Sequence, residues 1–221
     1  MFSAYSLLFI VPPLIAGLLA QAWVKRAFEQ GSKVRTASGL TGTEVCRRLL
    51  DSGGLQVGVE QIGGNLSDHY DPRAKVMRLS QPVANSSSVA AVAVAAHETG
   101  HAFQDARHES LFTMRGSLAP AMGFASQAWF PLAMFGWFSH ASGLVLLGAA
   151  VFSITVLFQL VTLPVEFGAS KRAMSMLTAQ GIITPAEAPV ARKVLTAAAL
   201  TYVVATLIAV YQLVILLLSR R

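Results

Sequence analysis

The sequence predicts a mainly α-helical membrane protein with about four transmembrane helices, joined to an α+β region that contains a small antiparallel sheet. Of its 221 residues, 54% are apolar and only 13% are charged, whereas soluble domains usually carry about a quarter charged residues. Four stretches are nearly free of charge, and each is close to the roughly 20 residues that cross a bilayer core: residues 4–24, 119–138, 143–163 and 197–218. In a soluble protein these stretches would be buried helices, but the remaining polar chain is too short to cover all four.

The first apolar stretch is typical of a retained membrane helix rather than a cleaved signal peptide. No Lys or Arg precedes it, and the first basic residues, Lys25 and Arg26, follow it, which is the reverse of a secretory signal. Pro12 and Pro13 lie in its middle and predict a kink.

The polar region after this helix predicts a helix, a sheet and a second helix in that order. Thr41 or Thr43 can cap a short helix. Residues 55–80 then alternate apolar and polar side chains and predict strands, two of which flank an Asp-Pro turn. Serines at 86–88 offer caps for a helix over 89–106, whose alanines and valines make it apolar nearly all round and therefore buried.

The second basic region follows the third apolar stretch and is expected to begin a new helix after Pro164, with Glu166 in its first turn. This organisation divides the chain into five parts. They are the first transmembrane helix (1–24), the polar region (25–118), a hairpin of two transmembrane helices (119–163), a polar helical segment (164–196), and the last transmembrane helix with the tail (197–221).

The basic residues indicate which side of the membrane the polar regions occupy. Residues 25–118 hold eleven Lys and Arg and residues 164–196 hold four, whereas the loop between the second and third spans holds none. Four crossings place both basic regions on one side, which the positive-inside rule makes the cytoplasmic side. Arg220 and Arg221 disagree with this orientation, because they would also prefer the cytoplasm, and three crossings would satisfy them.

The composition disfavours several classes of protein. The net charge of +6 is accounted for by membrane orientation and anionic lipid, and no alternation of basic and aromatic residues indicates a nucleic-acid surface. A transporter is disfavoured because the spans contain almost no ionisable residue. Cys46 is the only cysteine, and we expect a small buried side chain there rather than a nucleophile.

The segment His97-Glu98-Thr99-Gly100-His101 is the motif that carries chemistry. Two histidines four residues apart lie on one face of a helix, so both imidazoles can reach one metal ion. Glu98 can then act as general base on water that the metal activates. Two histidines and a glutamate on a buried helix must also find polar partners, and a metal meets that demand. The motif therefore predicts a zinc hydrolase, above all a peptidase, with one Zn²⁺ per chain.

A catalytic zinc takes three protein ligands, so one more is needed. His108 is two helical turns from His101, which is too far along one helix. His140 is predicted on the opposite face of the membrane, whereas His69 in the sheet stays a candidate. Glu166 is favoured, because the topology places it on the same side as the motif; its alternative role is an acid near a helix N-terminus.

These motifs resemble the bacterial membrane zinc metallopeptidases of the YugP type. The resemblance extends over nearly the whole chain and includes the first apolar span and residues 68–72, 78–80, 95–104 and 163–167. More distantly, the chain is similar to peptidases of the HtpX and CAAX-processing type, which also take a glutamate from a later helix as third ligand. The resemblance implies a zincin-like fold for the polar region and a multi-pass location in the bacterial inner membrane.

Two positions depart from these families. Peptidases of the HtpX type usually carry aspartate four residues after the third ligand, where this chain has Ser170. The YugP-type pattern has aspartate where this chain has Gly168. The glycine removes an acceptor for a zinc-bound histidine, and Asp105 or Asp68 is expected to replace it.

The predicted function is therefore a zinc-dependent endopeptidase that cleaves membrane-associated or unfolded polypeptides at the cytoplasmic surface. Glu98 is the expected base, and His69, Tyr70 and Arg172 are three candidates for the second donor to the oxyanion. The expected partners are membrane lipids and the polypeptide substrate, without nucleic acid; a homo-oligomer or a membrane quality-control partner stays open. The alternative function is a catalytically weak zinc-binding scaffold that regulates other membrane proteins, which Gly168 favours.

Overall fold

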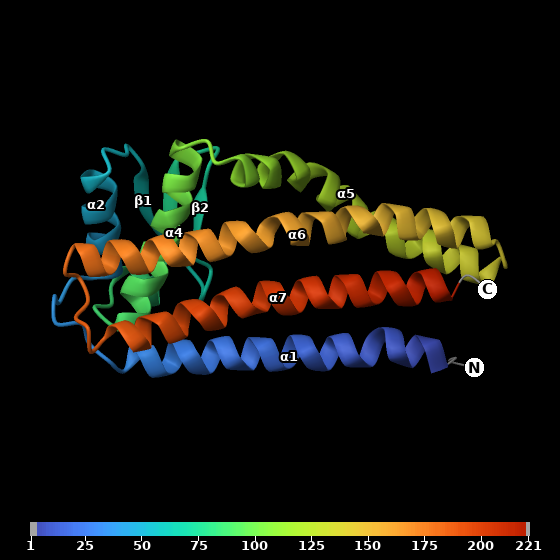
Figure 1. Ribbon diagram of the computed structural model, residues 1–221, viewed down its shortest axis with the longest axis horizontal. Coiled ribbons are helices and arrows are strands. Elements are labelled where there is room, and N and C mark those ends of the chain that lie inside the picture. Colours follow the sequence, from blue (N-terminus) through green and yellow to red (C-terminus); the bar gives the residue numbers. More distant parts are fainter. Residues whose placement is uncertain (1–3, 220–221) are drawn as a thin grey trace.

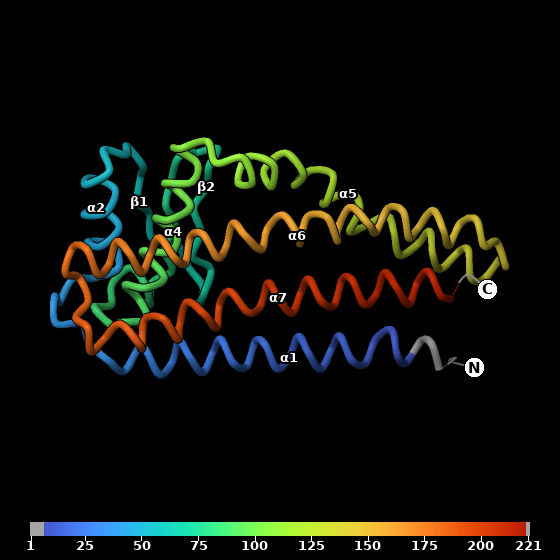
Figure 2. The backbone as a smooth tube through the Cα atoms, in the orientation of Figure 1, coloured from blue at the N-terminus to red at the C-terminus, as the bar shows by residue number. Residues whose placement is uncertain are grey.

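The computed structural model describes residues 4–219 and has two parts, a bundle of long helices and a smaller α+β unit at one end of it (Figure 1). The bundle consists of α1 (Ala4–Ser32), α5 (Ser110–Phe138), α6 (Ser142–Ala179) and α7 (Ala188–Leu218). The start of α1 and the end of α7 both lie at the end of the bundle that is far from the α+β unit (Figures 1 and 2).

Three of these helices are long and apolar enough to cross a membrane: Leu7–Ser32, Ser142–Ala179 and Ala188–Leu218. The other predicted span, residues 119–138, lies in α5, which is not among the three found within the described chain. α5 and α6 form a hairpin in close contact. A Cβ at Gly148 of α6 would lie only 3.0 Å from the backbone nitrogen of Ala133 in α5. Small residues allow such contact between membrane helices.

Contrary to expectation, no new helix begins after Pro164, because α6 continues through it without a break. A proline inside a helix removes one backbone hydrogen bond. The residues that follow on one helix face, Val165, Glu166, Ala169 and Ala173, are all buried, and the packing of this face outweighs the lost bond. α1 and α5 also continue through their prolines, and α5 bends along α6 (Figure 2).

The α+β unit confirms the predicted order of helix, sheet and helix. It contains α2 (Gly42–Ser52), β1 (Gly58–Ile62), β2 (His69–Asp71), β3 (Val76–Ser80), the short α3 (Gln81–Ala84) and α4 (Val89–Ala106). Thr41 caps α2 in a capping box with Glu44, and the Ser88 side chain accepts a hydrogen bond from the backbone of Ala91 at the start of α4. α4 is buried along most of its length, as its apolar composition predicts.

The sheet has the strand order β1-β3-β2 and is mixed, so the prediction of an antiparallel sheet is only partly right. β2 and β3 form the antiparallel hairpin that the Asp-Pro turn predicts. β1 lies parallel to β3, because the loop of residues 63–68 carries the chain past the position of β3 before it reverses into β2. β2 is therefore an edge strand, and it contacts α4.

α4 and α6 cross in close contact at Gly100. A Cβ at this position would lie 2.9 Å from the carbonyl oxygen of Ala169 in α6, so only glycine allows this distance. Glu166 lies almost one turn before Ala169 on the same helix. The crossing therefore brings Glu166 over the histidine motif.

Candidate metal centre

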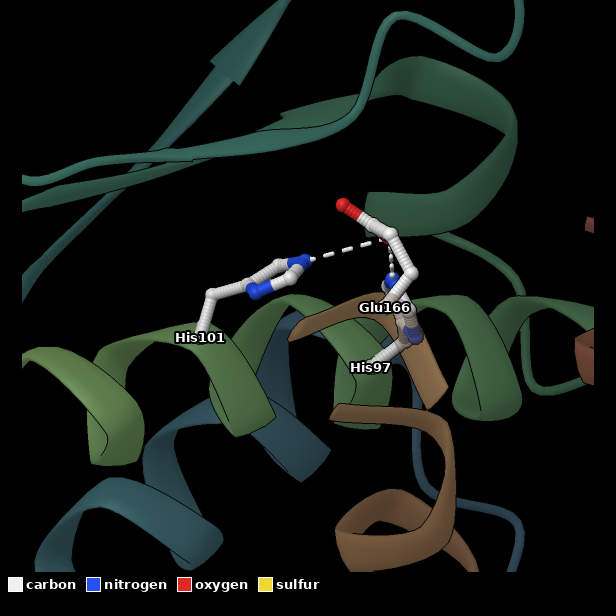
Figure 3. A group of neighbouring side chains, drawn as sticks. All are labelled: His97, His101 and Glu166. Carbon is white, nitrogen blue, oxygen red and sulfur yellow. Dashed lines mark hydrogen bonds and ion pairs between the residues drawn. The ribbon is translucent and has the colours of Figure 1, made fainter. Parts of the chain in front are cut away.

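α4 presents both motif histidines on one face, and Glu166 reaches them from α6 (Figure 3). The ring centroids of His97 and His101 are 4.8 Å apart. Oxygen Oε2 of Glu166 lies 3.2 Å from Nε2 of His97 and 3.6 Å from Nε2 of His101. Glu166 is only 1% exposed, so its carboxylate depends on these neighbours for polar contacts.

The three side chains fit a zinc ion. Their ligand atoms all lie within 4.8 Å of one another. With metal–ligand bonds of about 2.0–2.1 Å, tetrahedral ligands are roughly 3.4 Å apart, which agrees with the distances from Glu166 to the two histidines. Two imidazoles and one carboxylate are also a donor set of catalytic zinc sites. His97, His101 and Glu166 are also the three residues that we favoured as ligands from the sequence.

Arg115, on α5, belongs to this site although the sequence did not single it out. Its Nη1 donates a hydrogen bond to Oε1 of Glu166 at 3.0 Å. The two oxygens of the carboxylate thus have different partners, since Oε2 faces the histidines. Arg115 and Glu166 are 51 residues apart in the chain, and no local pattern links them.

Each histidine has a second partner at its other ring nitrogen. Nδ1 of His101 lies 2.8 Å from Oε1 of Gln104, and Nδ1 of His97 lies 3.2 Å from the hydroxyl of Ser170. The Gln104 amide also donates to the carbonyl of Val165 in α6, at 2.9 Å. These contacts hold both rings with Nε2 toward Glu166 (Figure 3), as partners of metal-binding histidines generally do.

The expected substitutes for an aspartate at Gly168 have other partners, so that expectation is wrong. Asp105 accepts a hydrogen bond from the Tyr70 hydroxyl at 2.6 Å. Asp68 accepts hydrogen bonds from the backbone and hydroxyl of Ser80. Both carboxylates serve the sheet and its contact with α4, and the acceptors for the histidines come from Gln104 and Ser170 instead.

Glu98 follows His97 in α4 and faces the sheet. Its Oε2 accepts a hydrogen bond from the backbone N–H of Tyr70 in β2, at 3.2 Å. Burial raises the pKa of Glu98 to about 7 against the opposing effect of His97, and the carboxylates of Glu166 and Asp68 add to the rise. The edge strand thus holds a carboxylate beside the two histidines.

The three candidates for the oxyanion donor differ in how far they are already engaged. The Tyr70 hydroxyl donates a hydrogen bond to Asp105. Nδ1 of the exposed His69 lies 2.9 Å from the carbonyl oxygen of Ser67. Arg172 pairs through Nη2 with Glu109. Its Nη1 is buried and has no hydrogen-bond partner among the described residues.

The other histidines considered lie outside the cluster. His108 follows the end of α4. His140 lies in the loop between α5 and α6, at the end of the bundle opposite the α+β unit (Figure 1). This separation agrees with the exclusion of His140 on topological grounds.

Comparison with known proteins agrees with this geometry. Residues 6–221 match a family described as "Putative neutral zinc metallopeptidase". The chain belongs to this family. It is also 45% identical over 195 residues to the "Putative membrane protease YugP" of Bacillus subtilis, an alignment that covers 88% of this chain and 87% of that relative. No solved structure matches the chain.

Membership in the neutral zinc metallopeptidase family confirms the resemblance seen in the motifs. The family implies zinc and a polypeptide substrate, and the three apolar helices indicate a membrane protein. Within the described residues, His97, His101 and Glu166 form the cluster that fits the metal.

Proposed function

We propose that this chain is a membrane-embedded zinc-dependent endopeptidase, with His97, His101 and Glu166 as ligands of one Zn²⁺. The observation that carries the proposal is the convergence of two imidazole Nε2 atoms and one buried carboxylate oxygen. Glu98 lies beside them with its carboxylate held by the backbone of β2. Ligands and base thus occupy one small site.

Each residue has a separate role in this mechanism. A bound zinc ion would supply a Lewis acid that activates water and polarises the scissile carbonyl. Glu98 accepts the proton of the attacking water and then delivers it to the leaving amine. His69, Tyr70 and Arg172 stay the three candidates for the second donor to the oxyanion. Of these, Arg172 has a buried Nη1 without a partner among the described residues.

The substrate that suits this site is an extended polypeptide, either membrane-associated or unfolded. β2 is the edge strand of the sheet, and the backbone N–H of Tyr70 is directed to Glu98 rather than to β3. A peptide added along the free edge of β2 would therefore lie beside the proposed base. This arrangement is typical of zincin-like peptidases and supports that assignment for the α+β unit.

We further propose four crossings of the bacterial inner membrane, with the α+β unit on the cytoplasmic side. α1, α6 and α7 each connect the α+β unit with the far end of the bundle, and α5 is the segment that carries the chain from the unit to that end (Figure 1). If the other three cross the membrane, α5 must cross it as well. The basic residues of the α+β unit support the cytoplasmic side.

The scaffold alternative depended on the glycine at position 168. Gln104 and Ser170 are the partners of the two histidines without an aspartate at this position. Metal binding without cleavage of casein or of any membrane polypeptide would favour the alternative.

The proposed function is tested with the variant Glu98→Gln. The amide has nearly the same shape but cannot take a proton, so we expect cleavage of an unfolded polypeptide to fall at least about a hundredfold while bound zinc is unchanged. Cleavage of casein and metal content are measured on the purified protein.

Glu29→Gln is the matched control, because Glu29 is exposed on α1 and far from the metal centre in the chain. It makes the same chemical change and should leave cleavage at the level of the unmodified protein. Full activity in Glu98→Gln would show that the mechanism is wrong.

A further inference from the structure

A groove of about 330 Å³ lies between α6 and α7 and does not include the metal ligands. Its lining is mostly apolar, with Phe167 and Met174 from α6 and Leu195 and Ala199 from α7. Two cations, Lys171 of α6 and Arg192 of α7, lie on its opposite helices, and the hydroxyl residues Ser170 and Thr196 complete the lining. An apolar cleft flanked by two positive charges matches an amphiphile with an anionic head.

The two cations have no counter-charge of their own. Both are exposed, and neither forms an ion pair with a residue of the described chain. No acidic side chain lines the groove within residues 4–219. By contrast, Arg172, the neighbour of Lys171, is paired with Glu109. The groove therefore presents a net positive charge that a ligand can neutralise.

The height of the groove along the helices corresponds to lipid headgroups. Lys171 is eight residues beyond the apolar stretch 143–163, or roughly 12 Å along the helix. Arg192 is five residues before the stretch 197–218, or roughly 8 Å. The headgroup layer occupies about 5–8 Å outside the hydrocarbon core, and long basic side chains reach back into it. Phe167, 48% exposed, lies nearer the hydrocarbon.

We propose that this groove binds an anionic phospholipid, with the phosphate between Lys171 and Arg192 and an acyl chain along Phe167 and Leu195. Basic pockets between membrane helices are suited to anionic headgroups. The proposal requires only that the helices lie in a membrane, and it stands whether or not the chain cleaves peptides.

The proposal is tested by photo-crosslinking in nanodiscs of phosphatidylcholine. The full chain is reconstituted with a small fraction of photoactivatable phosphatidylglycerol or photoactivatable phosphatidylcholine, and labelled peptides are identified by mass spectrometry. We expect the anionic lipid to label residues 167–174 and 192–199 about tenfold more than the zwitterionic lipid.

The double variant Lys171→Gln/Arg192→Gln should lose this preference. Lys33→Gln/Arg73→Gln is the control, because both residues are exposed cations outside the groove. This variant loses the same positive charge as the groove variant but should keep the preference for the anionic lipid. Bound zinc and the melting temperature show that each variant is folded.

Three results would overturn the proposal. The first is equal labelling by both lipids, and the second is an undiminished preference in the Lys171→Gln/Arg192→Gln variant. The third is displacement of the lipid by an acidic polypeptide, together with weaker binding of that polypeptide to the double variant in nanodiscs that contain phosphatidylcholine alone. The third result would assign the groove to a polypeptide.

Discussion

At the scale of single residues, the two oxygens of Glu166 have separate partners. Oε2 faces both histidines, whereas Oε1 accepts a hydrogen bond from Arg115. A carboxylate held in this way offers one oxygen to a metal, because the other is already engaged. We therefore infer that Arg115 positions the proposed third ligand.

Replacement of Arg115 by alanine is expected to lower zinc affinity by about tenfold. The guanidinium also repels a cation, which would favour zinc binding in the variant. This effect is the smaller one, because Arg115 contacts the oxygen that faces away from the histidines. Loss of Arg115 removes the hydrogen bond that it donates to the buried Oε1 of Glu166. Competition with a chelator, followed by metal analysis, measures the affinity.

Arg115→Lys should recover part of the affinity, because it keeps the charge but lacks the planar guanidinium. Arg73→Ala, at an exposed site in the β2–β3 turn, should bind zinc normally. An unchanged or higher zinc affinity in Arg115→Ala would contradict a positioning role.

At the scale of elements, the crossing of α4 and α6 assembles the site. α4 carries the two histidines and the proposed base, α6 carries the proposed third ligand, and Gly100 allows the two backbones to approach. Gln104 of α4 also bonds the carbonyl of Val165 in α6. The distance between these two helices therefore determines whether Glu166 reaches the histidines.

Gly100→Ala should weaken both the fold and the metal site. The added methyl group would lie 2.9 Å from the carbonyl oxygen of Ala169, and backbone atoms cannot yield as a side chain can. We expect a loss of about 1–3 kcal/mol in stability and lower zinc affinity, measured by chemical unfolding and chelator competition.

Gly116→Ala on α5 is the control, because no atom lies within 4 Å of a Cβ there. It should leave zinc affinity unchanged and, through its better helix propensity, stabilise the helix by up to about 1 kcal/mol. A Gly100→Ala protein with normal zinc affinity would mean that the crossing tolerates a wider separation.

At the scale of the whole molecule, the chain path agrees with the proposed four crossings. The α+β unit, with most of the basic residues, lies at one end of the bundle, and the start of α1 and the end of α7 lie at the other (Figure 1). An even number of crossings has this consequence. Arg220 and Arg221, which favour an odd number, lie outside the described residues.

Cysteine labelling in intact cells should place the two ends of the bundle on opposite sides of the membrane. Cys46 is buried, and burial raises the pKa of its thiol to about 12, so it should not react with a maleimide at neutral pH. We expect Ser139→Cys, in the α5–α6 loop, to react with an impermeant maleimide from outside.

Asn65→Cys, exposed in the loop between β1 and β2, should react only after the cells are permeabilised. Reaction of both cysteines from the same side would contradict four crossings with a cytoplasmic active site.

Local sequence patterns were sufficient to predict much of this protein. The bounds of α4 and the β2–β3 hairpin follow from spacing and turn chemistry over a few residues. The sequence narrows the cap of α2 to Thr41 or Thr43, and the structure has Thr41. Both motif histidines follow from one helical turn. The apolar stretches also predicted the three candidate spans, because the hydropathy that marks a span is a property of one contiguous segment.

Tertiary structure alone decided the features that join distant segments. The parallel pairing of β1, the unbroken course of α6 through Pro164, and the partners of the histidines all depend on packing between elements. Arg115 is the clearest case, since its contact with Glu166 spans 51 residues. Side-chain spacing along one helix is set by local geometry, whereas contacts between helices depend on how closely their backbones pack.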